Sequence, residues 1–327
     1  MKARPVFPSK LLAAAAAILV VLSAPSLFAQ VSLETTTSAG VLIGTSRELV
    51  LSGSYIVSQL DWAMRPLVFT GSGLLVSTPE GLRASLEVLA GVPGKTGRIT
   101  DKDFLNGDGE VTHFSEHDSF TEGALLLDAR IGRQFALGER FTIEPFAGFS
   151  IMRFKWTARD GYLQYPPEGS APFTPWDPQA TPMVFVFGTG IVYQQTWYIP
   201  AAGAKATLRF GDNMEAALSL GFSPYLWMND LDNHEMRSLD FAGTLSGGLM
   251  LDPTLGVTWR LSPRSRLSLD LGYRVIWGLT GDTLMTGTGV EGDTGPELDP
   301  GDWVRYIGSS GVSFDAFRLC LSLDVSL

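Results

Sequence analysis

The chain has 327 residues and a formal net charge of −10 at pH 7, with 34 acidic against 24 basic side chains. This acidity argues against nucleic acid as a partner, because the phosphate backbone would be repelled. A single cysteine, Cys320, excludes an intrachain disulfide framework. The 36 glycines, 19 phenylalanines and 8 tryptophans favour many strands with aromatic anchors over a helical protein.

The first segment, residues 1–29, has the pattern of a secretory signal peptide. A positively charged start precedes an apolar stretch over 11–22 and a run of small residues, and we predict cleavage after Ala29. The apolar stretch is short for a spanning helix, which disfavours an uncleaved membrane anchor. We therefore predict an exported chain with one domain over residues 30–327.

Strict alternation of apolar and polar residues marks the predicted strands. From Phe317 to Leu327 the odd positions are all apolar, while the even positions are mainly polar, and 267–277 repeats the pattern. A soluble sandwich also alternates, but its strands average about five or six residues. The longer runs found here suit tilted strands that cross an outer membrane, with apolar residues toward lipid and polar residues toward the lumen. Such strands must close into a barrel, because lipid cannot satisfy unpaired backbone groups.

Ten such runs predict an all-β fold, a ten-stranded antiparallel transmembrane β-barrel with long extracellular loops. The predicted strands are 33–50, 54–77, 81–97, 120–137, 140–159, 183–210, 214–229, 241–262, 265–282 and 302–326. Short periplasmic turns are expected at 78–80, 137–139, 211–213 and 262–264. Long extracellular loops are expected at 98–119, 160–182, 230–240 and 283–301.

Six tryptophans lie in or near the predicted strand ends. Two interpretations stay open for each of them, an interfacial girdle or packing inside the lumen. The six are Trp62, Trp156, Trp197, Trp227, Trp259 and Trp277.

Two acidic sets occupy the ends of predicted strands. Asp101 and Asp103 form a D-x-D pair, and Asp230, Asp232 and His234 form D-x-D-x-H. The order of the strands alone places both sets at the extracellular end. Imidazole is the side chain best suited to proton transfer near neutral pH, so the pattern predicts water activation without a metal. A zinc or calcium site is the alternative, which is disfavoured because zinc usually recruits more His or Cys.

The other two histidines, His113 and His117, fall in the predicted loop 98–119. We expect them to be solvated loop residues without a part in the chemistry.

Five segments in chain order resemble the omptin family, which are outer-membrane endopeptidases with a ten-stranded barrel. They are GTSRE at 44–48, VSQLDW at 57–62, the Asp101 to Asp103 pair, AGF with Arg153 and TAR within 147–159, and DLDNH at 230–234. The resemblance spans the barrel from about residue 33 to the end. It implies a location in the bacterial outer membrane, with the active site facing the exterior.

The resemblance also implies catalytic roles for four residues. Asp232 would orient the imidazole of His234 and stabilise its protonated form, while His234 takes a proton from a water molecule. Asp101 and Asp103 would hold that water from the other side, with one of them keeping a proton because adjacent carboxylates repel. The water would attack the peptide carbonyl directly. The resemblance implies no metal or other cofactor.

Two further carboxylates, Glu48 and Asp230, match the family positions around the substrate residue before the cut. A pair of carboxylates there favours Arg or Lys, and the family prefers to cleave between two basic residues. The acidity of the chain would help to steer basic peptides or proteins outside the cell toward the site.

A lipid partner is the point at which the sequence departs from the family, whose members typically need lipopolysaccharide. Arg153 matches one outward-facing lipid-binding residue. Thr196 stands where a second arginine is expected, and Phe149 and Ile151 replace polar residues of the same site. We therefore predict weak or absent dependence on lipopolysaccharide.

Two other functions compete with the protease. A barrel that has kept the fold could act as an adhesin or plasminogen receptor, although the retained acidic and histidine residues argue against lost chemistry. A small porin is the other alternative, but the narrow lumen would be filled by inward Arg274, Arg318, Asp270 and Asp324. A closed barrel leaves no free strand edge, so we predict a monomer.

Overall fold

The computed structural model describes residues 31–166, 172–288 and 298–327. The predicted signal peptide, residues 1–29, lies outside the described residues. Throughout the described part, regular structure consists of strands. None of the described residues form a helix long and apolar enough to cross a bilayer.

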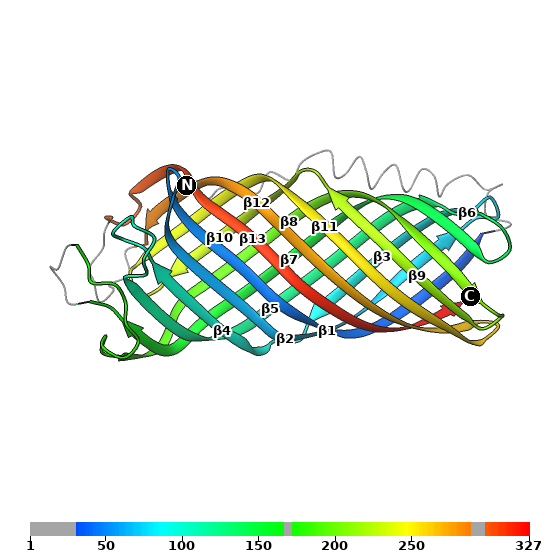
Figure 1. Ribbon diagram of the computed structural model, residues 1–327, viewed down its shortest axis with the longest axis horizontal. Helices are drawn as coiled ribbons and strands as arrows, with labels where there is room; N and C mark the ends of the chain where they lie inside the picture. The colour runs from blue at the N-terminus through cyan, green and yellow to red at the C-terminus, as the bar shows by residue number, and fades with distance from the viewer. Residues whose placement is uncertain (1–30, 167–171, 289–297) are drawn as a thin grey trace.

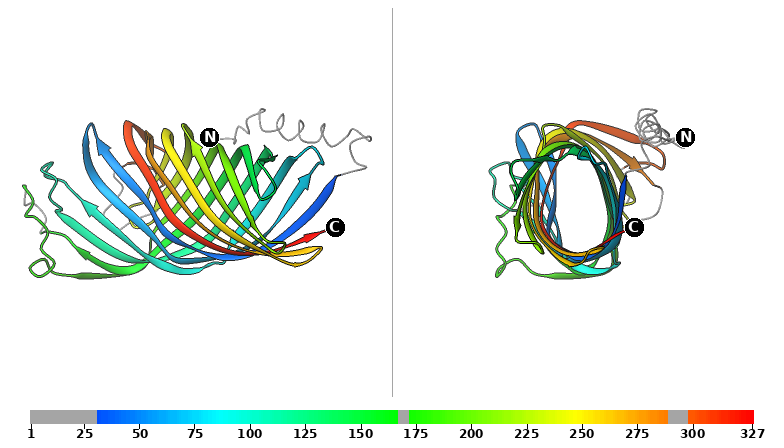
Figure 2. Two further views of the ribbon diagram at one scale, coloured as in Figure 1. Left: turned by 45° about the vertical axis from the view of Figure 1, so that its right-hand side comes forward. Right: turned by 90° about the vertical axis from the view of Figure 1, so that its right-hand side faces the viewer.

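The strands form one antiparallel sheet that is 13-stranded by segment (Figure 1). β1 pairs with both β2 and β13, which closes the sheet into a ring that is seen end-on in Figure 2. The strands are β1 (Ser32–Ser52), β2 (Tyr55–Ser77), β3 (Leu82–Gly91), β4 (Gly94–Asp103), β5 (His113–Arg133), β6 (Phe135–Ala136), β7 (Phe141–Gln164), β8 (Val184–Phe210), β9 (Met214–Ser223), β10 (Leu226–His234), β11 (Leu239–Ser262), β12 (Ser265–Gly287) and β13 (Trp303–Ser326).

The chain crosses the barrel wall ten times, as the sequence predicts, and each crossing is called a pass. β3 and β4 are one pass interrupted at residues 92–93, and β9 and β10 are one pass interrupted at 224–225. Within each of these pairs both segments share the same neighbours, β2 and β5 for the first pair and β8 and β11 for the second. The two-residue β6 only extends the edge beside β7.

The tight turns lie where they were predicted, at the end of the barrel that also holds the C-terminus (Figure 1). At the other end, the four predicted loops all begin too early, because β7 continues to Gln164 inside the loop predicted at 160–182 and β12 continues to Gly287 inside the loop predicted at 283–301. The loop predicted at 98–119 covers only 104–112, and the loop predicted at 230–240 covers only 235–238. These strands continue beyond the lipid, where both faces can be polar, so apolar alternation no longer marks them.

An apolar belt surrounds the half of the barrel nearest the tight turns. On β13 the side chains of Leu319, Leu321 and Leu323 point outward and are exposed, while Ser322 on the opposite face is buried. Exposed apolar residues also occur within residues 249–261 of β11. A tilted strand needs about 9–11 residues to cross a bilayer, whereas β13 has 24. The other half of the barrel therefore projects beyond the membrane.

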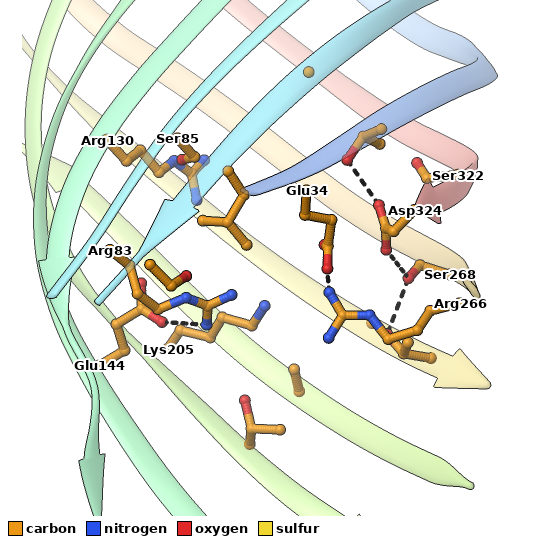
Figure 3. Close-up of a pocket in the computed structure, with 18 of the residues that line it drawn as sticks. Glu34, Arg83, Ser85, Arg130, Glu144, Lys205, Arg266, Ser268, Ser322 and Asp324 are labelled. Carbon is orange, nitrogen blue, oxygen red and sulfur yellow. Dashed lines mark hydrogen bonds and ion pairs between the residues drawn. The ribbon is translucent and has the colours of Figure 1, made fainter. Parts of the chain in front are cut away.

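The lumen of the membrane half contains a polar cavity of about 510 Å³. Charged side chains line it and pair across it, including Arg83 with Glu144 at 2.9 Å (Figure 3). This cavity lies at the opposite end from the two acidic sets, so it is not the candidate active site.

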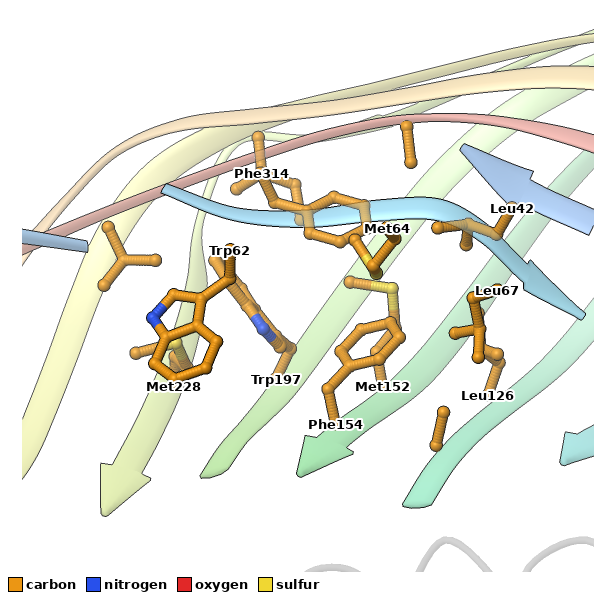
Figure 4. Packing of buried hydrophobic residues seen from close by; sticks show 14 of the residues in the cluster. Leu42, Trp62, Met64, Leu67, Leu126, Met152, Phe154, Trp197, Met228 and Phe314 are labelled. Carbon is orange, nitrogen blue, oxygen red and sulfur yellow. The ribbon is translucent and has the colours of Figure 1, made fainter. Parts of the chain in front are cut away.

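A layer of apolar side chains fills the lumen between this cavity and the outer end (Figure 4). Three of the six tryptophans, Trp62, Trp156 and Trp197, belong to this layer and are fully buried. The interfacial girdle is therefore wrong for these three, whereas Trp259 and Trp277 are exposed on the outside of the barrel. The filled lumen argues against the small porin.

Candidate active site

The outer mouth of the barrel brings the two acidic sets to opposite walls. Asp101 and Asp103 end β4, and Asp230, Asp232 and His234 end β10. In the ring, β4 lies between β2 and β5, while β10 lies between β8 and β11 on the far side. All five residues lie beyond the apolar belt, in the part of the barrel outside the membrane.

Asp101 and Asp103 are two residues apart on one strand, so both point to the same face. The hydroxyl of Ser58 on β2 donates a hydrogen bond to Asp101 Oδ1 at 3.0 Å. Burial, followed by the charge of Asp103, raises the pKa of Asp101 to about 7. Burial also raises the pKa of Asp103. This pair can therefore share a proton near neutral pH.

On the opposite wall, Asp232 and His234 form a hydrogen-bonded pair. His234 Nε2 lies 2.7 Å from Asp232 Oδ2, and the ring of Phe241 packs edge-on against the imidazole at 5.1 Å. Burial acts to lower the pKa of His234, but the charge and hydrogen bond of Asp232 outweigh it and raise the pKa. Oδ1 of Asp232 is buried without a hydrogen-bond partner.

The two walls are close enough to influence each other. The charge of Asp101 stabilises protonated His234, and the charge of Asp232 disfavours ionisation of Asp101. The four residues predicted to be catalytic therefore lie at one end of the barrel, within electrostatic range of one another.

A second acidic group is formed by Glu48 on β1 and Asp230 on β10. Both are buried, with exposed fractions of 9% and 7%. Burial, then the charges of Asp232, Asp230 and Asp101, raise the pKa of Glu48 well above its usual value. Burial raises the pKa of Asp230 to about 6, although hydrogen bonds from the Gly243 amide and the Tyr193 hydroxyl oppose the shift. A cation bound between these carboxylates would relieve their mutual repulsion.

Sequence reasoning missed the residues that support Asp230. Tyr193 and Gln195 on β8 and Gly243 on β11 connect to its carboxylate through hydrogen bonds. Their only local signal is that Tyr193, Gln195 and Trp197 alternate along one face of a predicted strand. That spacing does not show which distant residue they contact.

The prediction that His113 and His117 are loop residues is wrong. Both belong to β5. His113 is paired with Asp103 in the strand register and packs edge-on against Tyr165 at 4.8 Å. His117 Nδ1 lies 2.6 Å from the Asp160 carbonyl oxygen. Both histidines are thus held by the barrel wall, because β5 begins earlier than its apolar pattern indicates.

Arg153 lies exposed on the outer surface of β7, where it donates to Gln194 Oε1 at 2.7 Å. Thr196 is directly opposite it on β8. Phe149 lies on the same face of β7, and its ring centroid is 5.9 Å from that of Trp227. An apolar contact therefore occupies the surface beside Arg153.

Groups of three or more His, Cys, Asp or Glu side chains placed to hold a metal ion are absent from the described residues.

Comparisons with known proteins agree on one family. The model of the omptin family matches residues 29–295. The plasminogen activator of Yersinia pestis is 24% identical over 250 residues, which is 72% of this chain and 73% of that protein. The structure of the outer membrane protease OmpT from Escherichia coli has a TM-score of 0.79 at 17% identity, covering 90% of this chain and 97% of that one. At this identity the likeness to OmpT shows a shared fold.

The family match covers most of the barrel, including both acidic sets at its mouth. This chain therefore belongs to the omptin family of outer-membrane proteases.

Proposed function

We propose that this protein is an endopeptidase that cuts peptide bonds next to basic residues by means of a water molecule activated by His234 and Asp232. The observation that carries the proposal is the His234–Asp232 pair at 2.7 Å, facing the Asp101 and Asp103 carboxyl groups across the mouth. The carboxyl groups of Glu48 and Asp230, termed the acidic pocket from here on, lie within electrostatic range of Asp232 and would supply the preference for a cation.

In the proposed reaction, neutral His234 removes a proton from a water molecule as the water attacks the scissile carbonyl carbon. Asp232 stabilises the imidazolium that forms. Asp101 and Asp103 share one proton and hold the water, with the ionised oxygen accepting its second hydrogen. The tetrahedral intermediate then collapses, the C–N bond breaks, and the imidazolium returns its proton to the leaving amine. The products are a carboxylic acid and an amine, which exchange a proton to give a carboxylate and an ammonium ion, and no covalent enzyme intermediate forms.

The substrate residue before the cut would place its charged end between Glu48 and Asp230. Arginine or lysine fits because each carries a cation on a long apolar stem that can pass the surrounding aromatic rings. The second basic residue of a dibasic site would meet the remaining acidic wall formed by Asp101 and Asp103. Basic peptides or proteins outside the cell are thus the proposed substrates.

The orientation follows from the same geometry. The tight turns would face the periplasm, and the longer connections with the catalytic mouth would face the exterior, as in bacterial barrels generally. We propose that the barrel acts as a monomer, because each of its passes is paired on both sides.

The first test is cleavage of a quenched peptide containing Arg-Arg by the refolded barrel, with the cut located by mass spectrometry. We expect a single cut between the arginines and little cleavage when citrulline, the neutral isostere, replaces the first arginine. A folded barrel that leaves the peptide intact, with and without lipopolysaccharide, would contradict the protease and favour a binding barrel.

Lipopolysaccharide dependence is expected to be weak. Only Arg153 of the expected basic residues is present, and Thr196 and the Phe149–Trp227 contact occupy the adjoining surface. We expect addition of lipopolysaccharide to the detergent-refolded protein to change kcat/KM by less than about threefold, because a single exposed charge contributes little. An increase of a hundredfold or more, abolished by Arg153→Ala, would show that the lipid contact is intact.

A further inference from the structure

A chain of buried hydrogen bonds runs beneath the acidic pocket and ends on Asp230. The Trp197 indole Nε1 donates to Gln195 Oε1 at 3.2 Å. Gln195 Nε2 donates to the Tyr193 hydroxyl oxygen at 2.9 Å. The Tyr193 hydroxyl in turn donates to Asp230 Oδ2 at 3.2 Å. Trp197, Tyr193 and Gln195 are fully buried and Asp230 is 7% exposed, so water does not compete for these bonds.

This chain can run in only one direction. An indole N–H donates and never accepts, so the Gln195 atom that meets Trp197 must be the amide oxygen. The hydroxyl of Ser46 on β1 donates to the same oxygen at 2.6 Å. The amide nitrogen therefore faces Tyr193 and donates to it. Because the Tyr193 oxygen receives that hydrogen, its own proton is directed to Asp230.

Asp230 is held from its other side by the backbone of β11. The Gly243 amide donates to Asp230 Oδ1 at 2.6 Å. A Cβ atom at position 243 would lie 2.2 Å from Oδ1, so only glycine admits the carboxylate at this distance. Each oxygen of Asp230 thus accepts one fixed donor, a pattern that favours the ionised carboxylate over the acid.

We propose that Gln195 and Tyr193 are positioning residues, set in one direction by Trp197, that keep Asp230 charged and thereby tune the pocket to a cationic side chain. This inference rests on the proposed function of the pocket, and it adds the residues that determine its charge.

The proposal matters because Asp230 is surrounded by other acids. Glu48 faces it from β1, Asp232 lies on its own strand, and Tyr193 is the titratable group that meets it from β8. Asp101 on β4 adds to the repulsion on Glu48. With a pKa of about 6, Asp230 is largely ionised at neutral pH. Loss of the Tyr193 donor would raise that pKa further, so a proton would settle on Asp230 and weaken the pocket.

The test uses Tyr193→Phe and Gln195→Met in the full-length refolded barrel. The phenylalanine ring keeps the stacking of residue 193 against Trp62 and Trp156, whose centroids lie 5.3 Å and 6.1 Å away. Thr96→Val is the matched control, because it also removes a buried hydrogen bond, the 2.9 Å contact with Thr121, at a position outside the pocket. Unchanged heat-modifiable migration on gels would show that each variant folds.

The measurement is the affinity for p-aminobenzamidine, a fluorescent aromatic cation, from about pH 5 to about pH 9. We expect Tyr193→Phe to weaken binding about tenfold at neutral pH. Much of the affinity should return at the alkaline end, because the half-binding pH, at which the affinity is half of its maximum, moves upward. Gln195→Met should raise the half-binding pH by a smaller amount, since the Tyr193 hydroxyl can still donate to Asp230 but is no longer fixed in direction. Thr96→Val should match the wild type.

The outcomes separate this inference from the protease proposal. If the wild type binds the probe but does not cleave the peptide, the protease proposal is contradicted, whereas the inference about the hydrogen-bond chain is not. An unchanged affinity and half-binding pH in Tyr193→Phe would overturn the inference, as would a folded wild type that does not bind the probe. Where cleavage occurs, the variants should raise KM for the Arg-Arg peptide while kcat stays within about threefold of the wild type.

Discussion

Replacement of His234 by alanine is expected to lower kcat for the Arg-Arg peptide by roughly 10²- to 10⁴-fold, the range that a general base contributes. No other described imidazole lies on the β10 wall, where Asp232 holds the ring at 2.7 Å. KM should change little, because the pocket of Glu48 and Asp230 is left intact. Initial rates with the quenched peptide and a titrated amount of folded barrel give both constants.

The matched control for this experiment is His117→Ala. His117 also lies in the outer half of the barrel, but its ring contacts the Asp160 carbonyl and the Ser115 hydroxyl. We expect kcat to remain within about threefold of the wild type, as for a substitution that touches no reacting group. Equal losses in both variants would mean that the histidines act through the stability of the barrel, and the proposed base would be wrong.

The pH profile provides a second check on the same residue. Only neutral His234 can accept a proton, and its pKa is raised because Asp232 stabilises the charged form. Activity should therefore fall as pH drops through this raised pKa. In Asp232→Asn the stabilising charge is gone, so the acid limb should move to lower pH while the maximal kcat falls. An acid limb that stays in place would assign it to another group, such as Asp101 with its pKa of about 7.

Replacement of Glu48 by glutamine is expected to lower kcat/KM for the Arg-Arg peptide by about 10²-fold, because removal of one partner of a buried charge pair costs about 2–5 kcal/mol. Burial and the neighbouring acids raise the pKa of Glu48, so a proton must leave when the substrate cation enters. Glutamine cannot become charged in response. KM for the wild type should accordingly fall as pH rises, and this dependence should weaken in the variant.

A peptide with citrulline before the cut sharpens this experiment, because it keeps the shape of arginine without its charge. Glu48→Gln should bring the rates for the two peptides closer together. Glu122→Gln is the control, since it makes the same change on the outer wall of β5, where Glu122 pairs with Lys155 and Arg159. If Glu48→Gln still preferred arginine as strongly as the wild type, the proposed pocket would be misplaced.

The sequence by itself determined the barrel and the end at which its two acidic sets lie. Alternation over residues 317–327 separates a lipid face from a lumen face, because side chains on a strand point to opposite sides in turn. Counting such strands places Asp101 and His234 at the same end, since each antiparallel pass reverses direction. These inferences require only local periodicity and the order of elements along the chain.

Only the tertiary structure decided how far the strands extend and which residues meet inside. Above the membrane both faces of a strand can be polar, so nothing in the local pattern shows that β5 begins at His113. The local sequence around Trp62 fits an interfacial girdle and a lumen position equally well. Only the closed ring shows that its side chain is buried in the lumen.

The support for Asp230 is the clearest example of this limit. Its carboxylate receives hydrogen bonds from Tyr193, 37 residues earlier, and from Gly243, 13 residues later. These contacts depend on the register of β8 and β11 against β10, which is set by pairing along the whole length of the strands. A local pattern carries no information about such a register, and so the residues that hold the pocket could be identified only once the ring was closed.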